Sequence, residues 1–371
     1  MRVAIIITSL HSGGAERVTA NLANAWAALG WEISVITLAR KELDFYQLHT
    51  DIDRLALDLS GDSRGLIEAV QANVRRVVAL RCALRAFRPD TVVAMMTSAG
   101  VLATLATRGL NCRVIVSERI YPPLYPLGWI WNLLRRVAYR RACRVVMLTR
   151  EGLNWLEKEI PGAKGAVIPN PAIYPLPLGE PVLRPVQILA SERKLLLAVG
   201  RLDAQKGFDC LLDAFATLAI RHPSWDLVIL GEGPERAGLE QQIAALGLQR
   251  RASLPGRAGN MGDWYGRADL YVMSSRFEGF PNTLTEAMAH GCAAVSYDCD
   301  TGPRDLIRHE VDGLLVAPVG DVPALTEALD RLMGDEGERT RMASRALEVR
   351  ERYSMEKIIA MWDNVLEGKG W

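Results

Sequence analysis

Short runs of apolar residues alternate with longer segments of helical periodicity, and this alternation occurs twice along the chain. The runs of the first half are RVAIIIT, EISVITLA, TVVAMM, CRVIVS and CRVVMLT. Those of the second half are KLLLAVG, WDLVILG, ASLPG, DLYVMSS, CAAVSY and GLLVAP. Buried strands separated by helices are typical of parallel sheets that are covered on both faces. The pattern therefore predicts an α/β protein with two doubly wound domains.

A proline-rich stretch, IPNPAIYPLPLGEPVLRPV, separates the two halves. Such a stretch continues neither a helix nor a central strand, so it marks a linker. We predict an N-terminal domain over residues 1–175, a linker over 176–192 and a C-terminal domain over 193–352. A final one-faced helix is expected over 353–371. The length of 371 residues agrees with two domains of ordinary size.

Composition limits the partners and the compartment. The chain has 44 basic and 43 acidic residues, so it has no global field that would recruit nucleic acid. Its six cysteines stand singly, without the spacing of a zinc site or a disulfide framework. The start reads as a strand rather than a leader, and no run of about 18 apolar residues predicts a membrane span. We expect a cytoplasmic protein that binds no metal.

A basic pair follows the first strand of the second half, in GRLDAQKGFDCLLDAF. Arg201 and Lys206 lie between this strand and the next helix. Arginine binds phosphate through its planar fork and lysine as a point charge, so the pair could clamp a diphosphate. Two ordinary solvated charges remain the alternative for this loop taken alone.

The stretch EGFPNTLTEAMAHG combines a turn, a helix start and two glutamates. Gly279 permits close backbone approach and Pro281 fixes the turn, so the amides of a helix that begins near Asn282 or Thr283 are available to an anion. Glu278 and Glu286 flank this site, and carboxylates accept hydrogen bonds from ligand hydroxyls. The layout fits a nucleotide sugar.

Glu286 also has a purely structural interpretation. Thr283 and Glu286 have the spacing of a capping box, in which the glutamate reaches back to the start of its own helix. This alternative leaves Glu278 unexplained.

The same stretch, preceded by GRLDAQKGFD and followed by GPRDLIRHEVDGLLVAP, resembles the retaining glycosyltransferases of family four. The N-terminal HSGGAERV resembles the first loop of that family. The resemblance implies the GT-B fold, in which two Rossmann-like domains face a central cleft and the C-terminal helix crosses back to the first domain. It also implies catalysis without a bound metal and no cofactor beyond the nucleotide sugar.

The resemblance assigns roles to matching residues. Glu278 would contact sugar hydroxyls, Glu286 would hold the ribose, and Arg201 and Lys206 would neutralise the diphosphate. Glu278, Arg201 and Lys206 are thus expected to be catalytic. Further donor-binding positions are Gly13, Gly14, Arg257, Gly279, Phe280, Pro281, Asn282 and Thr283. Without the resemblance, the glycine pair could equally be a plain tight turn.

The triplet Ser-Glu-Arg in VIVSERIYPP departs from relatives that carry a histidine near this point. It resembles a subgroup that extends lipid-linked oligosaccharides, in which Asn often follows where this chain has Ile120. We expect Glu118, as a catalytic residue, or Arg119 to contact the acceptor. A structural ion pair is the alternative for either residue.

The segment LGWIWNLLRRVAYRRACR joins tryptophans to dense positive charge. Basic helices with interfacial tryptophans bind anionic membranes. The alternative is an amphipathic helix that packs its tryptophans on the first sheet. The residues expected to contact acceptor or membrane are Arg119, Trp129, Trp131, Arg135, Arg136 and Arg140.

The predicted function is that of a retaining hexosyltransferase. It would move a hexose or N-acetylhexosamine, with a UDP-sugar as the expected donor, to a hydroxyl of a polyprenyl-diphosphate-linked oligosaccharide. Such a reaction serves the assembly of surface polysaccharide or glycoprotein glycans, at the inner face of the cytoplasmic membrane. An epimerase or phosphorylase of the same fold and a non-catalytic nucleotide-sugar-binding subunit are the alternatives. A nicotinamide dehydrogenase is disfavoured because the first loop lacks G-x-G-x-x-G.

Overall fold

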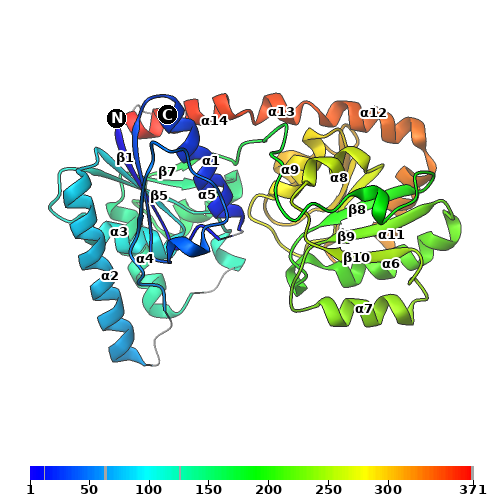
Figure 1. Cartoon of the computed structure of the whole chain (residues 1–371), viewed down its shortest axis with the longest axis horizontal. Helices are drawn as coiled ribbons and strands as arrows, with labels where there is room; N and C mark the ends of the chain where they lie inside the picture. The colour runs from blue at the N-terminus through cyan, green and yellow to red at the C-terminus, as the bar shows by residue number, and fades with distance from the viewer. Residues whose placement is uncertain (12, 62–64, 125–126, 369–371) are drawn as a thin grey trace. The chain divides into compact units, whose positions relative to one another are not determined.

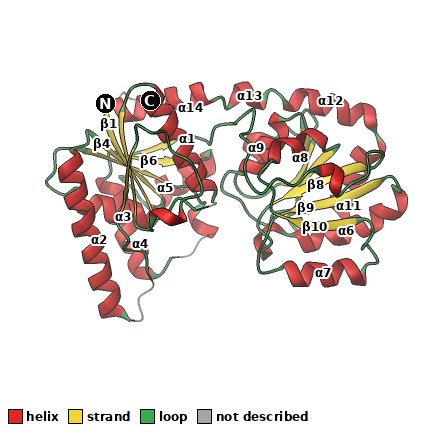
Figure 2. Cartoon of the chain, in the orientation of Figure 1, coloured by secondary structure: helices red, strands yellow, loops and turns green. Residues whose placement is uncertain are grey.

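The computed structural model describes residues 1–11, 13–61, 65–124 and 127–368. The chain forms two compact units, one of Met1–Asn170 with Ile358–Trp371 and one of Pro171–Lys357 (Figure 1). Each unit is built on one parallel sheet with helices packed against it (Figure 2). The predicted α/β architecture is therefore confirmed. The stretch 176–192 lies within the second unit.

The first unit contains a seven-stranded sheet in the order β3-β2-β1-β4-β5-β6-β7. All its neighbouring strands run parallel. The strands are β1 (Arg2–Ile7), β2 (Glu32–Thr37), β3 (Asp53–Ala56), β4 (Thr91–Met95), β5 (Arg113–Ser117), β6 (Arg144–Met147) and β7 (Gly165–Val167). The helices are α1 (Gly14–Ala28), α2 (Leu66–Phe87), α3 (Thr97–Ala106), α4 (Trp129–Arg141) and α5 (Arg150–Glu159). Short 3-10 turns lie at Lys41–Leu43 and Pro122–Leu124.

Helices α2 and α3 bury their apolar faces on the strands in the middle of this sheet. Leu80 and Leu84 of α2 share a core with Leu102 of α3 and with alternate residues of β1, β2 and β4. Helix α4 continues this layer, since Ala138 and Tyr139 pack with Val101 of α3. The three helices thus cover one stretch of the sheet in the order α2, α3, α4.

The last helix, α14 (Met355–Glu367), returns the chain to the first unit. Trp362 packs edge-on against Trp26 of α1, with ring centroids 5.7 Å apart. Arg113, at the start of β5, donates to the carbonyls of Val365 at 3.1 Å and of Leu366. The expectation that the C-terminal helix crosses back to the first domain is confirmed.

The second unit contains a six-stranded sheet in the order β10-β9-β8-β11-β12-β13. The strands are β8 (Lys194–Val199), β9 (Trp225–Leu230), β10 (Ala252–Gly256), β11 (Leu270–Met273), β12 (Ala294–Tyr297) and β13 (Gly313–Val316). The helices are α6 (Phe208–Arg221), α7 (Arg236–Ala245), α8 (Met261–Arg267), α9 (Asn282–Ala289), α10 (Pro303–Leu306), α11 (Val322–Gly334), α12 (Glu336–Ala346) and α13 (Val349–Arg352). Turns of 3-10 helix occupy Pro185–Gln187 and Ala204–Lys206.

The described part of the chain contains no helix that combines the length and the apolar composition needed to cross a bilayer.

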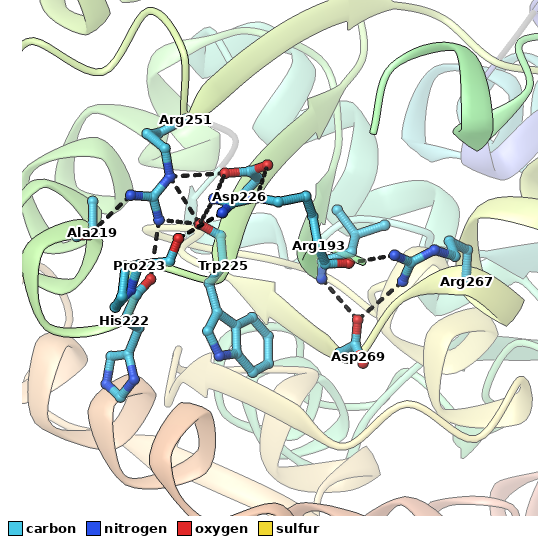
Figure 3. Close-up of polar contacts among 10 residues, drawn as sticks. Arg193, Ala219, His222, Pro223, Trp225, Asp226, Arg251, Arg267 and Asp269 are labelled. Atoms are coloured by element: carbon cyan, nitrogen blue, oxygen red, sulfur yellow. Dashed lines mark hydrogen bonds and ion pairs between the residues drawn. The ribbon is translucent and has the colours of Figure 1, made fainter. Parts of the chain in front are cut away.

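An arginine cluster holds the amino ends of β8 and β9 (Figure 3). Asp226 accepts hydrogen bonds from Arg193 and Arg251, each at 2.8 Å. Arg251 also donates to the carbonyls of Ala219 and His222, both at 3.0 Å. One carboxylate therefore balances two partly buried guanidinium groups and fixes the strand edge opposite to the loops that end β8 and β9.

Replacement of Asp226 by alanine should destabilise the second unit. It leaves Arg193 and Arg251 without their shared counter-charge in a partly buried position, which costs about 2 kcal/mol and lowers the melting temperature by roughly 4–8 °C. Calorimetry of the full chain measures this shift. Glu336→Ala is the matched control, because Glu336 pairs with Lys194 while its own side chain is 71% exposed. An equal effect of the two substitutions would contradict the role given to Asp226.

Candidate functional site

Two loops meet at the carboxyl edge of the second sheet, after β8 and β11. These strands are neighbours although they are far apart in sequence, and the chain winds away from them in opposite directions. In doubly wound sheets such a reversal of strand order opens a crevice in which ligands bind. Lys206 lies in the first loop and Glu278 in the second, so both glycosyltransferase-like motifs come to the reversal point.

The two loops are locked together by their backbones. The Ser274 hydroxyl donates to the carbonyl of Lys206 at 2.9 Å, and the amide of Arg276 donates to the carbonyl of Gln205 at 2.7 Å. Gly207 has φ of 61°, and a Cβ there would lie 2.2 Å from the Ser274 carbonyl oxygen. Only glycine satisfies both the left-handed conformation and this close approach.

Lys206 and Glu278 form an ion pair within this junction. The Lys206 ammonium lies 2.6 Å from Glu278 Oε1, and the two side chains are 18% and 8% exposed. The Ser275 hydroxyl donates to the same oxygen at 2.6 Å, and Thr301 donates to the Glu278 carbonyl. These hydrogen bonds compensate part of the cost of removing the two charges from water. They also hold the Glu278 carboxylate in one position.

Helix α9 begins directly after the Glu278 turn. It starts at Asn282 with Pro281 at the N-cap, and no side chain caps it. The alternative capping box needs Thr283 at the N-cap and is therefore not formed. The backbone amides in the first turn of α9 have no partner within the helix. They lie beside the Glu278 turn, where they favour the binding of an anion.

Gly302, from the GPRDL loop, packs on the turn that precedes α9. Its φ is 96°, and a Cβ there would lie 2.7 Å from Pro281 Cδ and 3.0 Å from the Gly279 carbonyl oxygen. The loop after β12 thus braces the Gly-Phe-Pro turn. Phe280 is buried and packs edge-on against Tyr353.

Glu286 lies one turn into α9 and is 5% exposed. Tyr265 donates to its Oε2 at 3.1 Å, and Tyr271 donates to the Thr283 hydroxyl at 2.9 Å. Two buried tyrosines thus hold the polar side chains of the first two turns. Sequence patterns did not indicate either tyrosine as a site residue. Tyr265 lies in α8 and Tyr271 in β11, and neither segment carries a recognisable binding motif.

The remaining cations of the second unit are more exposed. Arg201 is 71% exposed and lies 2.6 Å from Asp203 in its own loop. Arg257 is also exposed and follows β10, two strands from β8 in the same sheet. The structure joins Lys206 directly to Glu278, whereas Arg201 and Arg257 stand nearer to solvent at the same sheet edge.

The first unit contains a cavity of about 300 Å³ at the corresponding place in its own sheet. It lies where β1 and β4 are neighbours, which is the reversal point of that sheet. The lining comes from the ends of β1, β4 and β5, from α1 and from α4: Ile7, Thr8, Ala15, Glu16, Met96, Thr97, Ser98, Glu118, Ile120, Pro122, Leu127, Trp131 and Arg135.

The glycine pair opens α1 beside this cavity. Gly13 is the N-cap, and a Cβ there would lie 2.1 Å from Glu16 Oε2. The absence of a side chain at Gly13 lets Glu16 fold back over the helix start, where the Ser9 hydroxyl lies 3.3 Å from its Oε1. Gly14 is exposed in the first turn. The sequence reasoning missed Glu16, although the box GGAE carries it.

Glu118 lies in the cavity wall and is 3% exposed. Thr97 donates to its Oε2 at 2.5 Å, and Tyr139 donates to the same oxygen. Burial raises the pKa of Glu118, and these two hydrogen bonds and the charge of Arg135 oppose that rise. Sequence patterns did not indicate Thr97 and Tyr139, because each lies 21 positions from Glu118 on a different helix, α3 or α4.

Arg119 points to other partners. It donates to Asn170 Oδ1 at 2.8 Å, and its guanidinium lies 5.8 Å from the Trp362 ring centroid. Burial lowers the pKa of Arg119 to about 10, so the group stays charged at neutral pH. These contacts tie β5 to the end of β7 and to α14, which is a structural arrangement.

The basic tryptophan helix α4 divides its residues between cavity and solvent. Trp131 and Arg135 line the cavity, and the Arg135 guanidinium lies 4.8 Å from the Trp155 ring centroid. Trp129 is 77% exposed, so it does not pack on the sheet as one interpretation required. Arg136 and Arg140 are exposed as well, with Arg136 lying 3.7 Å from Glu159.

The raised pKa of Glu118 predicts a pH-dependent stability difference. Since the folded state holds this proton more tightly than the unfolded chain, its contribution is fully present below the unfolded pKa of about 4.3. That contribution is lost as pH rises through the folded pKa. The melting temperature of the wild type relative to Glu118→Gln should therefore fall as pH rises from about 4 to 8. Glu351→Gln, at an exposed carboxylate, supplies the reference slope; equal slopes for both variants would contradict the assignment.

Two family models match the chain. Residues 13–171 match a model described as "Glycosyl transferase 4-like domain", and residues 180–349 match one described as "Glycosyl transferases group 1". Together they take up nearly all of both units.

Full-length relatives carry related names. The chain is 27% identical to an uncharacterized glycosyltransferase of Haemophilus influenzae, over 98% of this chain and 99% of that protein. It is 27% identical, over 98% and 97%, to the Campylobacter jejuni GalNAc-alpha-(1->4)-GalNAc-alpha-(1->3)-diNAcBac-PP-undecaprenol alpha-1,4-N-acetyl-D-galactosaminyltransferase. It is 26% identical, over 98% and 99%, to the amylovoran biosynthesis glycosyltransferase AmsD of Erwinia amylovora.

Solved structures share the fold over the whole chain. Sucrose-phosphate synthase from Thermosynechococcus elongatus superposes with a TM-score of 0.84 at 18% identity, over 99% of this chain and 98% of that chain. Anabaena HepE in complex with UDP and glucose gives 0.79 at 19% identity, over 99% and 100%. With both family models matched and two parallel-sheet domains of the GT-B type present, the chain belongs to the glycosyltransferases of family four.

Proposed function

We propose that this protein transfers a hexose or N-acetylhexosamine from a UDP-sugar to a hydroxyl of a polyprenyl-diphosphate-linked oligosaccharide, with retention of anomeric configuration. The observation that carries the proposal is the Lys206–Glu278 ion pair, which lies where two parallel strands part and beside the start of α9. A cation, helix amides and a carboxylate are thereby gathered at one sheet edge. These are the groups that a sugar diphosphate requires.

Lys206 and the first amides of α9 would receive the diphosphate. As the bond between the sugar C1 and the phosphate oxygen breaks, negative charge grows on the departing UDP. Fixed donors stabilise this charge more in the transition state than in the ground state, which lowers the barrier. Arg201 lies in the same loop and would add a second, more exposed cation.

Glu278 would orient the sugar. Its Oε1 is already engaged by Lys206 and Ser275, so the carboxylate holds one position when the donor arrives. Glu286, held by Tyr265, would accept a hydrogen bond from the ribose. The acceptor hydroxyl then attacks C1 from the face of the leaving group and gives its proton to the departing phosphate oxygen, so that atoms and charge balance.

The cavity of the first unit would receive the acceptor sugar. Its lining combines carboxyl groups of Glu16 and Glu118, the hydroxyl of Thr97 and the ring of Trp131. Hydrogen-bonding groups around an apolar face are what a sugar ring needs. Glu118 would form a hydrogen bond with a hydroxyl of the acceptor, and its burial raises the pKa of this carboxyl group.

Relatives support the choice of donor and acceptor. The name of the Campylobacter relative describes the addition of an N-acetylgalactosamine to an undecaprenyl-diphosphate-linked sugar, and HepE was solved with UDP and glucose. A lipid-linked acceptor is held in a bilayer, so we place the protein at the inner face of the cytoplasmic membrane. The arginines of α4 and the exposed Trp129 fit that location.

The proposal is tested by incubating the purified chain with UDP-glucose, UDP-N-acetylglucosamine or UDP-N-acetylgalactosamine and a synthetic polyprenyl-diphosphate glycan. Formation of UDP only when acceptor is present supports transfer, whereas donor turnover without acceptor would indicate an epimerase or a hydrolase. The coupling constant of the new anomeric proton reports retention or inversion.

Lys206→Met should lower kcat by about a hundredfold or more, because the leaving diphosphate loses its fixed cation. The variant also leaves Glu278 buried without its partner, so its melting temperature should fall. The double variant Lys206→Met/Glu278→Gln removes both charges and should recover stability but not activity. Lys194→Met is the matched control at the other end of β8. Wild-type turnover in Lys206→Met would refute the site.

Removal of divalent ions should leave the rate within about twofold of its starting value. The protein itself supplies cations and helix amides at the proposed diphosphate position, which is the work a metal would otherwise do. Initial rates with excess EDTA and with added Mg²⁺ or Mn²⁺ measure this dependence. Loss of turnover in EDTA, restored by metal, would show that the diphosphate is held by an ion.

A further inference from the structure

Helix α9 carries part of the candidate donor site, and residues beside both chain crossings contact its two ends. The second unit spans Pro171–Lys357, so the chain passes between the units at both ends of this range. Tyr174 lies just inside the first crossing and Tyr353 just inside the second. The amide of Ala172 donates to the carbonyl of Tyr353 at 2.8 Å, so the two segments are joined to each other.

Tyr353 supports the turn in front of α9. Its ring packs edge-on against Phe280, with the ring centroids 5.6 Å apart, and Phe280 is 6% exposed. The Tyr353 hydroxyl donates to the carbonyl of Asp305 at 2.5 Å. Asp305 lies in α10, directly after Gly302, which packs on the same turn. Tyr353 therefore holds the turn from one side and its bracing loop from the other.

Tyr174 supports the far end of α9. Its ring lies edge-on to the His290 imidazole, with the centroids 4.9 Å apart, and the Arg350 guanidinium lies 3.3 Å from the Tyr174 ring centroid. Arg350 also donates to the carbonyl of Ala289, the last residue of α9, at 2.6 Å. A cation is favourable there, because the carbonyls at the end of a helix carry partial negative charge.

His290 connects Tyr174 to the second glutamate of the site. The His290 Nδ1 atom lies 2.8 Å from the carbonyl oxygen of Glu286. Its ring centroid lies 5.5 Å from that of Tyr265, whose hydroxyl donates to Glu286 Oε2 at 3.1 Å. His290 thus contacts both the backbone of Glu286 and the side chain that holds its carboxylate.

We propose that Tyr353 and Tyr174 are positioning residues of the donor site. Tyr353 fixes the turn before α9, and Tyr174 acts through His290 on the carboxylate of Glu286. A binding group has to be held within about 0.5 Å of its productive position, so the loss of a supporting ring is felt at the ligand. This role rests on the proposed function, in which the first amides of α9 receive the diphosphate and Glu286 the ribose.

Ordinary core packing does not account for these contacts. Tyr174 is 48% exposed, and the core cluster that α6 and α11 form with the sheet includes neither Tyr174 nor Tyr353. Their contacts are directed to the two ends of one helix. Helix α9 has only eight residues, and a helix this short depends on tertiary contacts for its stability and position.

Calorimetric titration of the full chain with UDP, without acceptor, tests the proposal. Tyr353→Leu and Tyr174→Leu should each weaken UDP binding about fivefold, because each removes an edge-on aromatic contact. Tyr353→Phe and Tyr174→Phe keep the ring and should bind UDP as the wild type does. In the transfer reaction, the KM for the UDP-sugar should rise in the leucine variants while the KM for the acceptor stays unchanged. A merely structural role would lower the melting temperature without separating the two KM values.

Trp31→Leu is the matched control, because Trp31 stacks on Trp26 in the first unit with ring centroids 5.8 Å apart. It should leave UDP binding unchanged. Wild-type UDP affinity and donor KM in both leucine variants would overturn the proposal, even if the protein transfers sugar. An equal loss of affinity in the phenylalanine variants would also overturn it. Weaker UDP binding in the leucine variants alone, without transfer by the wild type to any acceptor, would support the positioning role and contradict only the proposed function.

Discussion

The ion pair between Lys206 and Glu278 joins the two loops on which the candidate donor site is built. A pair this buried gains little net stability, because desolvation of both charges offsets much of their attraction. The ion pair matters because it fixes the positions of the two charged side chains. The hydroxyl of Ser275 and the backbone contacts around Gly207 leave each charge a single location. In the proposed reaction, Lys206 would face phosphate and Glu278 together, so the cation would not need to be ordered during the reaction.

The same topological feature occurs in each unit. In both sheets the first and fourth strands are neighbours, and polar residues of each candidate site follow those strands. The first unit offers a cavity with a buried carboxyl group, and the second offers cations and helix amides. Burial raises the pKa of Glu118 in the first unit, whereas Lys206 supplies positive charge in the second. In the proposed function, a neutral sugar would occupy the first site and a diphosphate the second.

Much of the fold and the positions of the donor-site motifs could be predicted from the sequence, for physical reasons. Strands such as β8 and β11 are continuous apolar runs because both faces of their sheet are covered. The GFPN turn predicts the start of α9. The partners of the site residues were not accessible. Tyr139 contacts Glu118 across 21 positions and Lys206 contacts Glu278 across 72. The spacing of apolar residues along a helix does not predict which distant hydroxyl will donate a hydrogen bond to a buried carboxylate. Arg119 illustrates the same limit, because its partners Asn170 and Trp362 come from segments that only the fold brings to β5.

Helix α2 shows most clearly what the apolar pattern of a sequence does not predict. Its apolar residues occupy two sides of the helix, and the pattern alone does not say which side the sheet will cover. The structure covers the side of Leu80 and Leu84, because that side meets α3 and the strands. The side of Val70 and Val74 is left to solvent, at a free-energy disadvantage that folding does not remove. Aliphatic residues persist there without any contribution to the core, whereas polar residues would serve solubility better.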